Sequence, residues 1–182
     1  MSSPSGGGKT TLVDALLKRR MLLARSVSIT TRPPRPGERH GAHYRFVSAR
    51  AFEQLRARGG LLEWAHVHGS CYGTPATPIA RALAAGRDMV LSIDVQGAKQ
   101  IKRRFGARAV LIFVLPPSLD DLRRRLLRRR TDAPEAIRLR LREARRELAC
   151  ASWYDYAVVN HRLETAVEEL AAIVIAERLR VQ

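Results

Sequence analysis

Residues 3–10 read SPSGGGKT, and an amphipathic segment typical of a helix follows at residues 12–20. This stretch matches the pattern G-x-x-x-x-G-K-[ST], except that Ser3 replaces the first glycine. Its three glycines allow main-chain N–H groups to close around phosphate oxygens. The helix that follows directs the positive end of its dipole at the same anion. The stretch therefore predicts a phosphate-binding loop rather than a flexible glycine-rich tail.

The loop predicts roles for the residues around it. Lys9 is expected to reach the β- and γ-phosphates of a nucleotide, and the Thr10 hydroxyl is expected to hold Mg²⁺. Asp94 follows a buried apolar run, where such enzymes place a carboxylate linked to Mg²⁺. A loop of this kind ordinarily follows a buried strand. The chain begins at Met1 with no room for one, so we expect the first strand of the sheet to be missing.

The rest of the chain alternates apolar strands with helices, which favours a single α/β domain with a parallel sheet flanked by helices. Near-continuous apolar runs predict buried strands at residues 89–93, 109–115 and 156–159. Shorter strands are expected at residues 26–29, 44–47 and 61–68 and around Tyr72. Helices are expected at residues 48–59, 75–86, 95–104, 118–129, 133–150 and 163–179. We assign residues 1–31, 86–117 and 147–182 to the core, 32–85 to an inserted strand-rich subdomain, and 118–146 to a helical lid.

Composition excludes several classes of protein. The 182 residues are 46% hydrophobic, which argues against disorder. No stretch approaches the roughly 20 apolar residues of a membrane span, and the polar N-terminus does not resemble a secretory signal. Cys71 and Cys150 are too few for a disulfide framework or a zinc site. We expect a cytoplasmic protein with no membrane partner.

The formal net charge of +16 arises mostly from arginine. One explanation is a GC-rich genome, which favours arginine codons. Arginine forks also match phosphate groups in two-point contacts, which indicates a polyanionic partner. That partner is either a nucleic acid or a small molecule with several phosphates. Because no nucleic-acid recognition motif is present, we expect no specific nucleic acid partner.

A second set of residues suits another phosphate group. The segment SITTRPPRPGE (residues 28–38) sets Arg32 and Arg35 beside hydroxyl groups in a proline-stiffened loop. Tyr44 and Tyr72 are candidate phenolic donors to the same group. From spacing alone, a solvated surface remains the alternative interpretation of these arginines.

Glu63 lies on a predicted strand of the same subdomain. A carboxylate that accepts two N–H bonds reads the Watson–Crick edge of guanine, which offers adjacent donors at N1 and N2. Adenine offers no such pair, so it would leave the carboxylate unpaired. A solvated surface glutamate is again the alternative.

A third basic cluster lies in the predicted lid. One interpretation is a solvated helical face whose arginines pair with Asp and Glu. The other is a mobile lid that brings arginines onto a transferring phosphoryl group, where they stabilise the developing charge. The cluster comprises Arg123, Arg124, Arg125, Arg128, Arg129, Arg130, Arg138, Arg140, Arg142, Arg145 and Arg146.

Together, these segments resemble the guanylate kinase family, in the style of its bacterial members, over nearly the whole chain. The matching pieces are residues 3–11, 26–38 (SVSITTRPPRPGE), 43–47, 62–74 (LEWAHVHGSCYGT), 91–97 (LSIDVQG), 113–119 (FVLPPSL), 128–141 and 158–160. The resemblance implies a core, a lid and a GMP-binding subdomain at residues 32–85. It also implies transfer of the γ-phosphoryl group of ATP to GMP with Mg²⁺, giving ADP and GDP in purine nucleotide metabolism.

The same resemblance implies a set of site residues. It implies an ATP site, with Asn160 near the nucleoside, at Ser5, Gly6, Gly7, Gly8, Lys9, Thr10, Thr11 and Asn160. It implies contacts with the GMP phosphate at Ser28, Arg32, Arg35, Tyr44 and Tyr72, and with guanine at Glu63 and Thr74. Asp94 is expected to contact GMP and, with Thr10, the metal. The implied catalytic residues are Lys9, Arg129 and Arg140, the two arginines acting from the lid.

The chain departs from the family pattern at several positions. Ser92 stands where the family usually has the first carboxylate of Asp-x-Asp, and Arg130 stands where a small residue follows the lid arginine. Two alternatives therefore stay open. One is an impaired or non-catalytic binding module, although such modules typically lack the lysine that is present at Lys9. The other is a P-loop kinase for a different phosphorylated small molecule. The sequence also leaves open the oligomeric state and whether dGMP is accepted.

Overall fold

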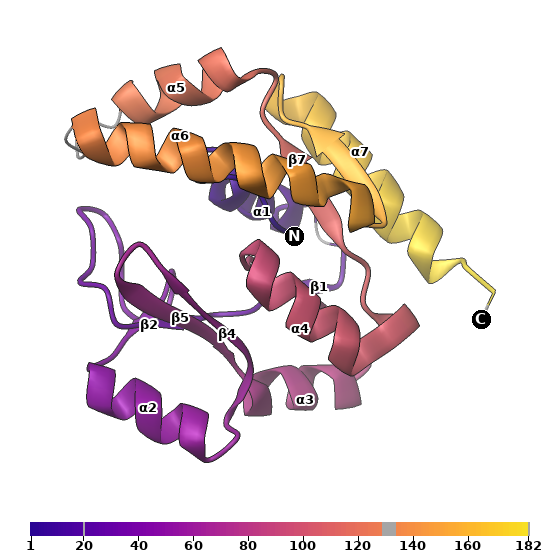
Figure 1. Cartoon of the computed structure of the whole chain (residues 1–182). Coiled ribbons are helices and arrows are strands. Elements are labelled where there is room, and N and C mark those ends of the chain that lie inside the picture. The colour runs from indigo at the N-terminus through magenta and orange to yellow at the C-terminus, as the bar shows by residue number, and fades with distance from the viewer. Residues whose placement is uncertain (20, 129–133, 182) are drawn as a thin grey trace. The chain divides into compact units, whose positions relative to one another are not determined.

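A computed structural model of the chain describes residues 1–19, 21–128 and 134–181, which pack into two compact units. The terminal unit comprises Met1–Arg19 and Ala107–Gln182, and the central unit comprises Arg20–Gly106. Each unit combines helices with parallel strands (Figure 1), so the predicted α/β class is confirmed. The division into core, subdomain and lid is a functional one and stays a prediction.

The terminal unit contains a parallel pair of strands, β7 (Ile112–Leu115) and β8 (Tyr156–Val159). Ser2 joins the opposite edge of β7: its N–H donates to the Ile112 carbonyl (2.9 Å), and its carbonyl accepts from the Val114 N–H (2.8 Å). Both predicted strands are confirmed, although the first begins later, at Ile112. The carboxyl end of β8 leads directly to Asn160, which lies buried.

Helices surround this pair of strands. They are α1 (Lys9–Leu17), α5 (Leu119–Arg128), α6 (Pro134–Ala149), the short 3-10 helix η2 (Cys150–Trp153) and α7 (Leu163–Arg178). Helix α1 packs on α7, and α5 runs beside α6 (Figure 1). The helices α5 and α6 share a buried apolar cluster of Leu122, Leu126, Ile137 and Ala144. The apolar residues of the predicted lid therefore pack against each other within one helix pair.

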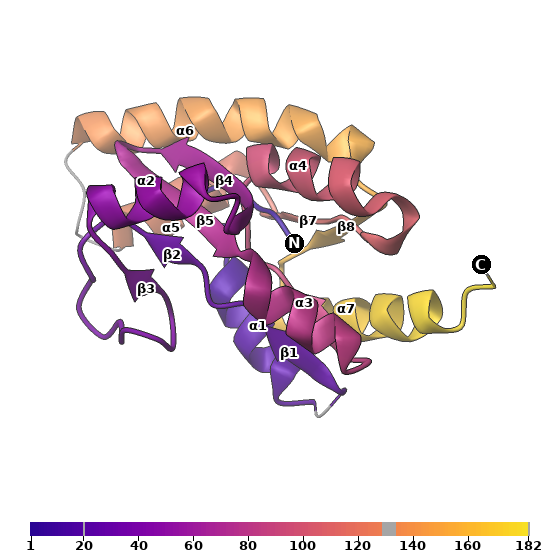
Figure 2. The same ribbon diagram turned by 90° about the horizontal axis from the view of Figure 1, so that it is seen from below.

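The central unit is built on a four-stranded sheet in the order β3-β2-β5-β4. Its strands are β2 (Ile29–Thr30), β3 (Arg45–Phe46), β4 (Leu61–Val67) and β5 (Ser70–Pro75). Strand β2 is parallel to β3, which lies beside it in Figure 2, and antiparallel to β5. Helix α2 (Ala49–Ala57) covers the sheet by packing Phe52 against Ile29 and Leu61. Ser48 caps this helix as predicted, because its hydroxyl accepts from the Ala51 N–H (3.2 Å).

A second, parallel pair of strands, β1 (Leu23–Arg25) and β6 (Asp88–Val90), accompanies α3 (Ala76–Ala84) and α4 (Val95–Phe105). The 3-10 helix η1 (Gly106–Arg108) follows α4. The strand predicted at residues 89–93 is wrong in extent, because β1 offers only 3 residues for pairing. None of the described helices is long and apolar enough to cross a membrane.

Candidate active site

The glycine-rich loop turns sharply before α1. The Gly7 N–H donates to the Pro4 carbonyl (2.9 Å), and Ser5 lies half-buried within this turn. Gly6 and Gly8 adopt φ angles of 93° and 90°, which residues with a Cβ rarely occupy. Gly8 is the N-cap of α1, and no side chain of the described residues caps that helix end. The positive end of α1 therefore begins at the loop, as a main-chain anion site requires.

Asn160 holds this loop from the end of β8. Its side-chain Nδ2 donates to the Gly7 carbonyl (2.9 Å), and the residue is 8% exposed. Arg125 of α5 donates from Nη2 to the Asn160 main-chain carbonyl (2.9 Å). A Cβ built at Gly8 would lie 2.3 Å from Asn160 Nδ2, so the amide occupies the space that a side chain would need. The described contacts give Asn160 a role in positioning the loop, and its predicted contact with the nucleoside stays a prediction.

Helix α5 also packs on the loop. A Cβ built at Gly6 would lie 3.1 Å from Leu122 Cδ1 and 3.2 Å from Leu126 Cδ2. Both leucines belong to the buried cluster that α5 shares with α6. The first helix of the predicted lid, α5, therefore touches the phosphate loop through apolar side chains.

The cationic residues predicted for phosphoryl transfer start from two helices of the terminal unit. Lys9 is the first residue of α1, and Arg140 lies on α6; both are half-buried. Thr10 and Thr11 follow Lys9 and are exposed. The predicted catalytic residue Arg129, like Arg130, lies outside the described residues.

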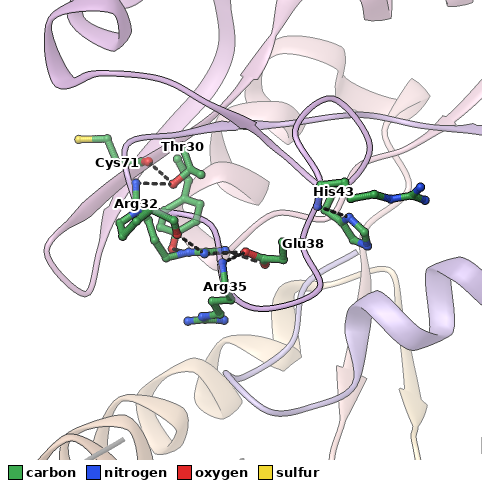
Figure 3. Close-up of polar contacts among 9 residues, drawn as sticks. Thr30, Arg32, Arg35, Glu38, His43 and Cys71 are labelled. Atoms are coloured by element: carbon green, nitrogen blue, oxygen red, sulfur yellow. Dashed lines mark hydrogen bonds and ion pairs between the residues drawn. The ribbon is translucent and has the colours of Figure 1, made fainter. Parts of the chain in front are cut away.

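In the central unit, Arg32 is surrounded by polar and aromatic partners. Its Nη1 and Nη2 donate to Glu38 Oε2 (2.8 Å) and Oε1 (2.9 Å), a two-point ion pair visible in Figure 3. Its Nε donates to the Tyr72 hydroxyl (3.2 Å). The guanidinium carbon lies 5.4 Å from the centre of the Tyr44 ring and 5.7 Å from that of Phe46. The structure thus brings together three of the residues predicted for the GMP phosphate: Arg32, Tyr44 and Tyr72.

Local hydrogen bonds set the course of this loop. The Thr30 hydroxyl donates to the Cys71 carbonyl (2.9 Å) and accepts from the Arg32 N–H (3.2 Å). At the far side of the turn, Glu38 Oε2 accepts from the Arg35 N–H (2.7 Å). Figure 3 shows the Arg35 side chain extending away from the Arg32–Glu38 pair. Arg35 is therefore not part of the assembled cluster, although it shares the same turn.

Charge and burial shift the titration of this cluster. Hydrogen bonding from Arg32 holds the pKa of the Glu38 carboxyl below its ordinary value, and the same bond raises the pKa of the Arg32 guanidinium. Burial raises the pKa of the Tyr44 phenol. At neutral pH the cluster therefore contains an ionised Arg32–Glu38 pair beside the neutral Tyr44 phenol.

Glu63 and Thr74 face each other across β4 and β5. Thr74 Oγ1 donates to Glu63 Oε1 (2.6 Å). Both residues are buried: Thr74 is 0% exposed and Glu63 is 4% exposed. The register pairs Leu61 with Pro75 and then Glu63 with Thr74, so a β-bulge interrupts β4 just before Glu63. The predicted guanine-reading pair is thus a buried carboxylate with a hydroxyl donor on one of its oxygens.

Asp94 has a structural role that the sequence did not predict. It is the N-cap of α4, and its Oδ1 accepts from the Gly97 N–H (2.8 Å). The two predicted metal ligands, Thr10 and Asp94, belong to different compact units. Ser28 is buried directly before β2, where its carbonyl accepts from the Arg45 N–H (2.9 Å). Whether Asp94 and Ser28 contact a ligand stays a prediction.

Nearly the whole chain is similar to one protein family. The family model described as guanylate kinase matches residues 1–177. The chain belongs to the guanylate kinase family. The resemblance inferred from the sequence motifs is thereby confirmed.

Individual guanylate kinases are similar over almost the whole chain. The guanylate kinase of Rhizobium etli is 51% identical over 180 residues, covering 99% of this chain and 82% of the relative. That of Chelativorans sp. is 50% identical, with coverages of 99% and 83%. The crystal structure of guanylate kinase from Anaplasma phagocytophilum superposes with a TM-score of 0.84 at 33% identity, covering 99% of this chain and 85% of that one.

The sequence predicted no role for Glu38 or Gly97 in these two guanylate kinase sites, and it predicted Arg125 only as a member of the basic lid cluster. Glu38 pairs with Arg32, Arg125 supports Asn160, and Gly97 lies under the Glu63 carboxylate. Glu38 lies in the same motif, six residues after Arg32. A turn at Pro36-Gly37 would bring the two side chains together, and this is the sequence feature that could have indicated the pair. Neither of the others carries a local signal, because each contact joins elements distant in sequence.

Proposed function

We propose that this chain transfers the γ-phosphoryl group of ATP to GMP, giving ADP and GDP. Membership of the guanylate kinase family supports an ATP:GMP phosphotransferase. The observation that carries the choice of acceptor is the buried Glu63 carboxylate with Thr74 hydrogen-bonded to it. A ligand that docks against a buried carboxylate has to present hydrogen-bond donors to it, because burying polar groups without matching partners is costly.

Guanine supplies such donors at N1 and N2. A carboxylate facing them accepts two hydrogen bonds, and each such bond to a charged group contributes roughly 1.5–3 kcal/mol. Adenine presents an acceptor at N1, so it would leave the carboxylate poorly paired. Glu63 and Thr74 therefore favour GMP over AMP.

The GMP phosphate fits the arginine–tyrosine cluster of the central unit. Arg32 already holds a two-point contact with the carboxylate of Glu38, and a phosphate presents the same pair of oxygens to a guanidinium. The Tyr44 and Tyr72 side chains carry phenolic O–H donors, which suit an anionic ligand. We propose that Arg35 and Ser28 also contact this phosphate.

The ATP phosphates fit the loop of the terminal unit. Main-chain N–H groups at the start of α1, together with Lys9, neutralise the β- and γ-phosphates. Arg140, and Arg129 outside the described residues, are proposed to stabilise charge on the transferring group. The GMP phosphate is itself the nucleophile, so alignment and charge neutralisation, and not a strong base, account for the rate.

Magnesium suits the predicted donors. Thr10 offers an exposed hydroxyl oxygen and Asp94 a carboxylate, which are the hard oxygen ligands that Mg²⁺ takes alongside substrate phosphates and water. When bound, the ion would neutralise charge on the β- and γ-phosphates. Among the described residues, no group of three or more His, Cys, Asp or Glu side chains gathers into a metal site. We further propose a cytoplasmic enzyme of purine nucleotide metabolism.

The test is ADP formation from Mg·ATP with GMP, AMP, CMP or UMP offered separately. We expect turnover with GMP and none of comparable rate with the others. Glu63→Gln should lose most of the preference for GMP over AMP. Glu53→Gln, which changes an exposed glutamate of α2 paired with Arg56, is the matched control and should keep it. Equal turnover with GMP and AMP, or full GMP preference in Glu63→Gln, would overturn the proposal.

A further inference from the structure

Gly97 lies directly against the Glu63 carboxylate. It is buried in the first turn of α4, and a Cβ built on it would lie 2.2 Å from Glu63 Oε2 and 2.9 Å from Glu63 Cδ. Real Cβ atoms do not approach neighbours so closely. The space that any other residue would fill with its Cβ is therefore occupied by the carboxylate.

Neighbouring contacts prevent the two backbones from separating to make room. Gln100, one turn further along α4, accepts from the Trp64 N–H through Oε1 (3.2 Å) and donates from Nε2 to the Trp64 carbonyl (2.7 Å). Asp94 Oδ1 holds the Gly97 N–H itself (2.8 Å). The two Gln100 bonds join α4 to β4 at the residue next to Glu63, and the Asp94 bond fixes the first turn of α4. A Cβ at position 97 would accordingly displace the carboxylate, the far end of a flexible side chain, and not the helix.

The backbone of Gly97 does not itself require glycine. The residue lies inside α4 and is absent from the positive-φ positions of the chain. Glycine in a helix costs roughly 0.5–1 kcal/mol relative to alanine. Helix formation therefore favours alanine at position 97, whereas the carboxylate of Glu63 requires glycine.

The location also suits a negative charge. The Glu63 carboxylate contacts the first turn of an 11-residue helix, whose N-terminal end carries a partial positive charge. Thr74 holds the other carboxylate oxygen, Oε1, at 2.6 Å. The carboxylate is thus bounded by a hydroxyl on one side and by a helix turn without a Cβ on the other.

We propose that Gly97 is a specificity-determining positioning residue, whose missing Cβ holds the Glu63 carboxylate in the orientation that reads guanine. This inference rests on the proposed function, because it concerns how the same site recognises its base. Gly97 acts through Glu63 and contacts no reacting atom. Replacing Gly97 by a residue with a Cβ should therefore change the recognition of GMP and leave ATP binding unaffected.

The direct test is Gly97→Ala in the full-length enzyme. We expect KM for GMP to rise roughly 10- to 100-fold, the equivalent of losing one bond to a charged group, with KM for ATP unchanged. The preference for GMP over AMP should fall by a similar factor. The thermal midpoint should stay equal to that of the wild type or rise, because alanine favours the helix. Lys99→Ala, at an exposed position of the same helix, is the control and should change neither constant.

A second substitution distinguishes positioning from damage to the fold. Glu63→Asp shortens the side chain by one methylene, so it withdraws the carboxylate from the place where the added Cβ at position 97 needs room. In the double variant Gly97→Ala/Glu63→Asp, the loss in kcat/KM for GMP should be smaller than the product of the two single losses, as expected of directly contacting residues. This coupling is measured from kcat/KM alone and does not depend on the thermal midpoint.

The outcomes separate this inference from the proposed function. A wild-type enzyme without GMP-dependent turnover would overturn both. A GMP-specific wild type whose Gly97→Ala variant keeps its KM for GMP and its preference over AMP would overturn only the inference. Losses that multiply without coupling in the double variant would also overturn it, because Gly97 would then act independently of the carboxylate.

Discussion

The two proposed phosphate sites of this chain are built from different materials. In the terminal unit, the site is made of main chain: a glycine turn with φ near 90° at Gly8, a helix end and the buried amide of Asn160. In the central unit it is made of side chains, with Arg32 held by Glu38 and Tyr72. The same kind of ligand group can therefore be presented by backbone geometry or by a network of charged and phenolic groups.

This difference determines what each site tolerates. A main-chain site is damaged by adding atoms, because its N–H groups converge only where Cβ atoms are absent. A side-chain site is damaged by changing the shape of a donor, because its two-point contact depends on a planar fork. Substitutions at the two sites should therefore affect different nucleotides, with the largest loss in the main-chain site.

Gly8→Ala should have the largest effect. Alanine at φ 90° is strained by about 1–3 kcal/mol, and its Cβ would also meet Asn160 Nδ2 at 2.3 Å. We expect kcat/KM for ATP to fall by roughly 100-fold, because about 3 kcal/mol corresponds to two decades, while equilibrium binding of GMP is unchanged. Gly86→Ala is the control, since its φ of 67° gives similar strain with no atom within 4 Å of the added Cβ. Equal losses in both variants would show that strain alone is responsible.

Arg32→Lys should raise KM for GMP by roughly 30-fold, because lysine keeps the charge but loses the two-point contact, about 2 kcal/mol. KM for ATP should not change. Arg39→Lys, at an exposed arginine of the same loop, should leave both constants near those of the wild type. If Arg32→Lys keeps the wild-type KM for GMP, charge and not geometry defines the side-chain site. Both KM values are measured by steady-state kinetics in which GMP and ATP are varied in turn.

Asn160→Ala should raise KM for ATP by about 10-fold, because the Gly7 carbonyl loses its donor in a buried position, at a cost of about 1–2 kcal/mol. His161→Ala changes the exposed neighbour and should have no such effect. An increase in KM for GMP instead of ATP would contradict the assignment of Asn160 to the phosphate loop.

Glu38 should give the smallest effect, visible in the pH dependence of stability. Its pKa is lowered in the folded chain from 4.5, first by the hydrogen bond from Arg32. A lowered folded pKa contributes stability above the unfolded value, which is lost as pH falls through the folded pKa. Because the pair is partly solvated, we expect Glu38→Gln to cost less than about 1 kcal/mol at pH 7. The difference from wild type should shrink below pH 4.5 in denaturant unfolding curves.

Glu53→Gln is the control, because it removes an exposed ion pair with Arg56. It should lower the free energy of unfolding at pH 7 by even less than Glu38→Gln does. A stability difference for Glu38→Gln that stays constant from neutral to acid pH would contradict the role assigned to the Arg32–Glu38 pair.

The sequence predicted the main-chain site more completely than the side-chain site. The loop is contiguous, so eight residues contain its turn, its helix start and Lys9. The side-chain cluster is dispersed, and Tyr72 meets Arg32 across 40 positions. The two arginines and two tyrosines were predicted from their chemistry, but the partner that orients Arg32 was not, because pairing with Glu38 depends on the turn between them.

Contacts between residues that are distant in sequence could not be predicted from the sequence. Asn160 reaches Gly7 across 153 positions, and Gly97 meets Glu63 only because α4 is tied to β4. The strand predicted at residues 89–93 ends at Val90 for a similar reason, since its length depends on the partner strand β1. Local patterns therefore predicted elements and chemistry, whereas the supporting contacts required the folded chain.

The contrast between the two sites is tested most directly by titration calorimetry of ATP and of GMP, each alone, on Gly8→Ala and Arg32→Lys. We predict a crossed result: Gly8→Ala weakens ATP binding and leaves GMP binding at the wild-type value, and Arg32→Lys does the reverse. If either variant weakens both nucleotides by the same factor, the two sites are not separately built, and the account given for them is wrong.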